Sequence, residues 1–153
     1  MNILSSTSIM KHSGIVHIDK IRVLGPFTHK PLGRKWYLLD PETGELQPTA
    51  ATPDQITLHE FGGKVRFQSR GLESNGMASQ LLIECCPPLV LQGHNWCGHD
   101  DLDNYVFTIF EKLTGKLKLK GTADDFAAWG SGDVTLEEIH LTANFACPAE
   151  CVT

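Results

Sequence analysis

Three hydrogen-bonding side chains occur at every second position near the end of the 153-residue chain: His140, Thr142 and Asn144. Residues two apart on a strand project from the same face, roughly 7 Å apart along it. An imidazole beside a hydroxyl and an amide can orient a divalent cation or a phosphate group. The same spacing is also found on strands whose polar face only meets water, so both interpretations stay open.

A second polar group is the sequence Gln92-Gly93-His94-Asn95. Gly93 permits a tight backbone turn, His94 could bind a metal or carry a proton, and Asn95 can hydrogen-bond to nearby backbone. A purely structural turn is the alternative for these residues. The sequence has no glycine-rich phosphate loop, no Gly-x-Ser-x-Gly elbow and no His-Glu-x-x-His helix.

Strands and one principal helix must position these residues. The helix is predicted by apolar side chains at i, i+3, i+4 and i+7 spacing, with acidic residues before it and Lys112 and Gly115 at its end; these are Leu102, Tyr105, Val106, Ile109, Phe110 and Leu113. β-Branched residues and turn signals predict strands or hairpins over 15–24, 36–39 with 46–47, 56–61 with 64–69, and 81–84.

The remaining segments are assigned from weaker signals. We expect a polar connection over 49–55, an extended piece over 89–92 after Pro87 and Pro88, and a loop over 121–132. In a last strand over 136–145, alternation predicts a core face made by Ile139, Leu141, Ala143 and Phe145. Together the elements predict an α+β fold, a mostly antiparallel sheet with one principal covering helix. Residues 1–14 are expected to form a flexible tail and residues 15–153 a single domain.

Composition narrows the class of protein. Hydrophobic residues make up 41% and charged residues 20% of the chain, as in an ordinary globular protein. The net charge of −5 counts against a domain that grips DNA mainly by neutralising phosphates. No apolar run reaches the roughly 18 to 20 residues of a membrane span. Five cysteines without a secretory signal predict free thiols in a reducing cytosol.

Three stretches resemble the gene II/X replication proteins of filamentous bacteriophages. Residues 18–27 (IDKIRVLGPF) are similar to the first strand of that family, and residues 84–95 (ECCPPLVLQGHN) are similar to its Leu-Gln-Gly-His-Asn segment. Residues 139–145 (IHLTANF) are similar to a later strand. The resemblance is collinear over roughly residues 15 to 146 and covers the front part of a longer family.

The resemblance implies rolling-circle DNA replication, in which one strand of a phage or plasmid origin is nicked, held on a tyrosine and later rejoined. It implies a divalent cation, Mg²⁺ or Mn²⁺, and a location in the cytoplasm of the bacterial host. Origin DNA is the implied partner, together with the full-length replication protein. On this resemblance the metal-site residues are Glu84, His94 and His140, and the DNA-binding residues are Gln92, Asn95, Thr142 and Asn144.

The sequence departs from the family pattern at three places. His140 stands where the family has an aspartate, and Leu89 where it has a lysine. The two tyrosines, Tyr37 and Tyr105, are both expected to be packed, so the nucleophile is expected beyond Thr153 and the chain to be incomplete as a catalyst alone. The alternative hypothesis is a non-enzymatic DNA- or protein-binding regulatory module.

Overall fold

The computed structural model describes residues 15–60 and 62–144, so the expected tail over 1–14 lies outside the described residues. The strands are β1 (Ile15–His29), β2 (Lys35–Leu39), β3 (Leu46–Ala51), β4 (Asp54–Thr57), β5 (Lys64–Leu72), β6 (Ala78–Cys85) and β7 (Thr135–Asn144). The helices are α2 (Pro87–Gln92), α3 (Leu102–Lys116) and α4 (Ala123–Ser131). The α+β class is confirmed, with an antiparallel sheet dominating the described part of the chain.

The main sheet has the strand order β4-β5-β6-β1-β7, and all neighbours are antiparallel. β1 is long enough to pair with β6 along one edge and with β7 along the other. It continues past residue 24, where the predicted strand ended, because Gly25 and Pro26 still pair with β6. The pairing of β1 with β7 shifts register twice, between Ile18 and Lys20 and between Arg22 and Val23.

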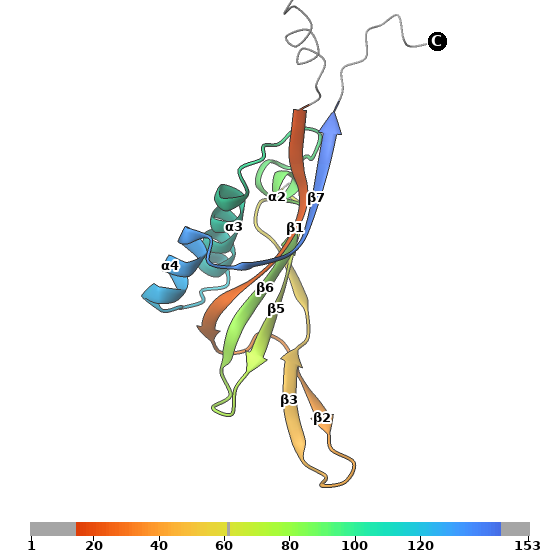
Figure 1. Cartoon of the computed structure of the whole chain (residues 1–153), viewed down its shortest axis with the longest axis vertical. Coiled ribbons are helices and arrows are strands. Elements are labelled where there is room, and N and C mark those ends of the chain that lie inside the picture. Colours follow the sequence, from red (N-terminus) through yellow and green to blue (C-terminus); the bar gives the residue numbers. More distant parts are fainter. Residues whose placement is uncertain (1–14, 61, 145–153) are drawn as a thin grey trace, which may run out of the picture.

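The first hairpin is confirmed but stands outside this sheet. β2 and β3 pair only with each other in a two-stranded sheet that projects away from the main one (Figure 1). The expected polar connection over 49–55 is wrong, because β3 continues to Ala51 and β4 begins at Asp54. Ala51 is buried, and its carbonyl accepts a hydrogen bond from Gln68 Nε2 at 2.9 Å, which fastens the base of the hairpin to β5.

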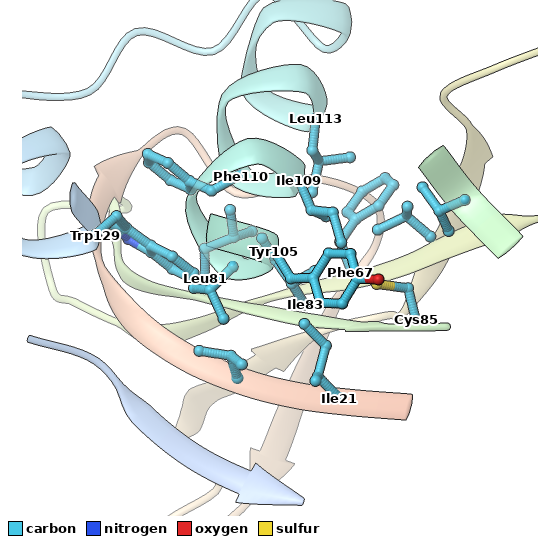
Figure 2. Packing of buried hydrophobic residues seen from close by; sticks show 14 of the residues in the cluster. Ile21, Phe67, Leu81, Ile83, Cys85, Tyr105, Ile109, Phe110, Leu113 and Trp129 are labelled. Atoms are coloured by element: carbon cyan, nitrogen blue, oxygen red, sulfur yellow. The ribbon is translucent and has the colours of Figure 1, made fainter. Parts of the chain in front are cut away.

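The predicted principal helix is α3. Asp101 caps its start by accepting a hydrogen bond from the Asn104 amide at 3.0 Å, and the apolar stripe faces the sheet. The core lies between α3 and one face of the sheet (Figure 2). It is made by apolar side chains of β1, β5, β6, α2, α3 and α4, among them Ile18, Ile21, Phe27, Phe67, Leu81, Ile83, Ile109, Phe110, Leu113 and Trp129.

The expected loop over 121–132 is wrong, because residues 123–131 form α4. A capping box starts this helix: Thr122 Oγ1 accepts from the Asp125 amide, and Asp125 Oδ2 accepts from the Thr122 amide, each at 3.1 Å. Burial stabilises it, since Trp129 is 1% exposed and stacks on Phe110 with ring centroids 4.3 Å apart. The Trp129 indole also donates to the Pro26 carbonyl at 2.9 Å.

Two further expectations fail. Residues 89–92 are helical and not extended, because Pro87 and Pro88 occupy the first turn of α2, where their missing amide protons cost nothing. In β7 the alternation is present, but Leu141 is 61% exposed and Ile139 is also exposed. The helices cover β1, β6 and β5, and β7 lies beyond them at the edge of the sheet; Phe145 falls outside the described residues.

Gly25 lies directly under the Trp129 ring, and this contact gives the first testable prediction. A Cβ at position 25 would come within 2.5 Å of the indole, so Gly25→Ala should lower the free energy of unfolding by about 1–3 kcal/mol, the usual cost of overpacking. Urea denaturation measures it. Gly115→Ala is the control, since a Cβ there meets nothing within 4 Å and should raise stability by about 0.5–1 kcal/mol. Equal stability of the two variants would contradict this packing.

Candidate functional site

The predicted site residues fall into two groups. Gln92, His94 and Asn95 lie at the end of α2 and in the following loop, residues 93–99, and Asn144 at the end of β7 contacts that loop. Glu84 and His140 lie instead on the outer face of the sheet, the face opposite α3. Thr142 is in β7 opposite His17. The structure therefore brings most of the predicted DNA-binding residues together, and separates His94 from the other two predicted metal ligands.

The loop 93–99 is fixed to β1 and β7 by side-chain hydrogen bonds. Asn144 Nδ2 donates to the Trp96 carbonyl at 3.0 Å, and the buried His17 donates from Nε2 to the Asn95 carbonyl at 3.2 Å. Asn95 Nδ2 in turn donates to Asp19 Oδ1 at 3.4 Å. These bonds join residues far apart in sequence, so the loop is held as part of the domain.

Further hydrogen bonds close the loop 93–99 across its base and fix its far end. Gln92 Nε2 donates to the Cys97 carbonyl, closing the loop across its base. At the far end the Ile18 amide donates to the His99 carbonyl at 3.0 Å. Gly98 has no room for a side chain, because a Cβ would lie 2.9 Å from the Tyr105 hydroxyl oxygen. The predicted Gln92-to-Asn95 turn is thus the entrance to a loop tied down at both ends.

Tyr105 belongs to this frame. It is 3% exposed, its hydroxyl accepts a hydrogen bond from the His99 amide at 3.0 Å, and the two rings stack with centroids 3.7 Å apart. Burial raises the pKa of Tyr105, with the nearby Cys86 and Cys97 adding to the rise. The expectation that Tyr105 is packed is confirmed. That for Tyr37 is wrong: it is 51% exposed, because β2 lies in the projecting hairpin.

Trp96 is a residue that the sequence reasoning missed. It is 75% exposed, although its carbonyl is held by Asn144. Its ring meets the His94 imidazole edge-on, with centroids 5.0 Å apart. The signal in the sequence was a lone tryptophan between Gly93 and Gly98 in an otherwise polar stretch. A fixed loop that presents an exposed indole offers a planar apolar surface beside amide and imidazole groups.

The outer face carries a row of alternating charge across the sheet. Register places Glu138 opposite Arg22, Arg22 opposite Glu84, and Glu84 opposite Arg66, so each carboxylate lies next to a guanidinium. Glu84 Oε2 is 3.7 Å from Arg22 Nη1. Next to this row, Arg22 Nε lies 2.9 Å from Glu137 Oε2. These groups are partly solvated, so each pair adds little stability alone but fixes the side chains in position.

Lys20 links the two predicted metal ligands on this face. Its Nζ is 3.3 Å from Glu84 Oε1 and 3.0 Å from Glu138 Oε1, and Glu138 Oε1 is also 2.8 Å from His140 Nε2. The hydrogen bond to Glu138 is the main cause that raises the pKa of Lys20, and the same bond lowers the pKa of Glu138. A cation at Glu84 would therefore have to compete with a lysine and an arginine.

No group of three or more His, Cys, Asp or Glu side chains is arranged to hold a metal ion in residues 15–60 and 62–144. Glu84, His94 and His140 do not form one centre as they stand, and their role as ligands stays a prediction. Burial raises the pKa of the thiols of Cys85 and Cys86, and both are free, as is Cys97. Within the described residues, no helix has the length and apolar character to cross a membrane.

Comparison with known proteins shows the family to which the chain belongs. The sequence model of a family of replication-associated proteins, described as the N-terminal part of the phage gene 2 protein, matches residues 26–151, and the chain belongs to this family. The chain is similar to the replication-associated protein of the same type from Enterobacteria phage I2-2, with 24% identity over 131 residues. This match covers 86% of the chain but 38% of that relative, so the chain spans well under half of its length. The comparison with solved structures gave no significant match.

The bond from Asn144 to the Trp96 carbonyl predicts a local effect. Asn144→Ala should speed hydrogen exchange in residues 93–99 and lower the free energy of unfolding by only about 0.5–1.5 kcal/mol, the worth of one hydrogen bond. Hydrogen exchange with mass spectrometry measures it. Thr135→Ala, at the other exposed end of β7, is the control and should leave the loop unchanged. Unchanged exchange in Asn144→Ala would show that this bond does not hold the loop.

Proposed function

We propose that the chain is the amino-terminal domain of a rolling-circle DNA replication initiator and that its loop 93–99 contacts single-stranded origin DNA. Family membership supports a role in phage DNA replication, because the relative is a phage replication-associated protein. The observation that carries the DNA contact is the exposed Trp96 in a loop held by Asn144, His17 and Gln92. The site of action would be the cytoplasm of the bacterial host.

Stacking on Trp96 suits the charge of this protein better than phosphate binding does. With a net charge of −5, the chain has little to gain from releasing counterions along DNA. A base stacked on an aromatic side chain adds about 1–3 kcal/mol and needs no positive charge. Asn95 and His94 lie beside the indole and can add hydrogen bonds to a base edge or to the sugar-phosphate backbone. Gln92, Thr142 and Asn144 then act mainly by positioning the loop and its strand.

We propose origin nicking and joining for the longer family protein, of which this chain resembles the front part. Tyr105 is unsuited as a nucleophile, because it is buried, its hydroxyl accepts a hydrogen bond from the His99 amide, and its pKa is raised. Tyr37 is exposed, but lies on the projecting hairpin, away from the loop and the outer face. We therefore assign the nucleophile to neither tyrosine. The divalent cation, with Glu84, His94 and His140 as its candidate ligands, is proposed on the family resemblance.

Nicking can be tested directly on the chain. Incubated with supercoiled origin DNA and Mg²⁺ or Mn²⁺, it should leave the DNA uncut, because neither tyrosine is placed for attack on a phosphate. Agarose-gel separation of supercoiled and nicked circles measures this. Tyr37→Phe and Tyr105→Phe are the controls. Nicking that is lost in either variant would overturn the assignment, and nicking that survives in both would point to a different nucleophile in this chain.

DNA binding gives a second test. Trp96→Ala should weaken binding to a single-stranded origin oligonucleotide about 5- to 150-fold, the range that corresponds to about 1–3 kcal/mol of stacking. Fluorescence anisotropy measures it, and quenching of Trp96 on binding is an independent signal. Trp36→Ala, an exposed tryptophan on the hairpin, is the matched control and should bind like the parent. Equal binding by Trp96→Ala and the parent would refute the stacking role.

The alternative is a non-enzymatic regulator that binds another protein, such as the full-length replication protein. The β2–β3 hairpin favours it, because large apolar side chains gather there in solvent: Trp36, Tyr37, Leu38, Leu39 and Leu46. Exposed apolar clusters of this kind are typical of protein interaction sites. If the parent binds a full-length initiator but does not bind single-stranded DNA, this function would be favoured over the first.

A further inference from the structure

The side of β7 that continues the core face of the sheet is apolar and exposed. Register places Ile139 opposite Ile21 and Leu141 opposite Ile18, so both side chains lie on the core side of the sheet. Their partners in β1 are each 1% exposed, whereas Leu141 is 61% exposed. Val16, opposite Ala143, is exposed next to them. The core surface thus continues past the helices onto an uncovered strip at the sheet edge.

The backbone edge of β7 is open as well. Among the described residues, β7 pairs with β1 on one side only, and it is ten residues long. Natural edge strands usually carry lysine, proline, β-bulges or inward-pointing charges that prevent pairing with another strand. The bulge of β7 lies at Glu137, before the segment 138–144. β7 has neither proline nor lysine, and its charged residues on the outer face are engaged within the chain: Glu137 with Arg22 and Arg70, Glu138 with Lys20 and His140.

We infer that β7 pairs antiparallel with β7 of a second copy of this chain, and this inference does not depend on the proposed function. The sequence of the strand is self-complementary about His140. In that register Ile139 of each copy lies opposite Leu141 of the other, and Glu138 lies opposite Thr142. Apolar side chains meet apolar ones twice, and no carboxylate meets a carboxylate. A two-fold contact of this kind uses the same strip on both copies.

The pairing has a geometric consequence. Two five-stranded sheets would join into one continuous sheet. The two apolar strips would then lie side by side on the face that carries the helices. The end of β7 at Asn144 holds the loop 93–99, so antiparallel pairing would place the two loops at opposite ends of the joined strands. A second copy therefore covers the strip without covering Trp96.

The test is the state of association of the whole chain. Light scattering after gel filtration, repeated over a range of concentrations, should show a monomer–dimer equilibrium in the parent. Leu141→Glu should weaken dimerisation at least tenfold. Leu38→Glu, at an equally exposed leucine of the hairpin, should dimerise like the parent. A parent that stays monomeric at the highest soluble concentration, or a dimer lost in Leu38→Glu but kept in Leu141→Glu, would overturn the inference.

A second measurement needs no variant and covers the case that Leu141→Glu does not fold. Hydrogen exchange of the amides of residues 138–144 should slow as the parent concentration rises, because alternate amides of the free edge become paired. Protection that is high but independent of concentration would mean that another segment of the same chain occupies this edge, and would overturn the inference too.

Discussion

The pairing of β1 on both of its edges is the constraint on which the rest of this domain depends. One fifteen-residue strand joins β6, which lies under the helices, to β7, which lies beyond them. Its core-facing side chains, Ile18, Ile21, Val23 and Phe27, pack under the helices, while His17 and Asp19 near its start contact the loop 93–99. Any change that breaks this strand therefore separates the core from the loop, even if each part keeps its local contacts.

The two register shifts between β1 and β7 determine which side chains meet on the outer face. The first adds Asp19 to β1 and the second adds Glu137 to β7. Without the first shift, alternation along this part of β1 would be unbroken and Lys20 would share the face of Ile18. With the shift after Ile18, Lys20 projects to the outer face, where it reaches both Glu84 and Glu138. The row of alternating charge thus follows from backbone irregularities, and the ion pairs hold side chains in place more than they add stability.

Much of the fold could be predicted from the sequence wherever a local signal agreed with the final packing. α3 was predicted because its apolar period and end residues point to the same helix. α2 was missed because Pro87 and Pro88 stop a strand but also start a helix. α4 was missed although Thr122 and Asp125 have capping-box spacing, because glycines at 121, 130 and 132 indicated a loop. The site was predicted only in part: the grouping of Gln92, Asn95 and Asn144 needs long-range contacts that no spacing reveals.

The β2–β3 hairpin has a consequence for how such a domain can evolve. Its base is anchored by the buried Ala51 and the bond from Gln68, while all five residues of β2 are exposed. Substitutions along β2 leave the core packing of α3 and α4 untouched. Substitutions in this hairpin, or a longer turn, can therefore accumulate in different lineages with little loss of stability. Divergence between relatives should concentrate there, while Gly25, Trp129 and the partners of the loop 93–99 change slowly.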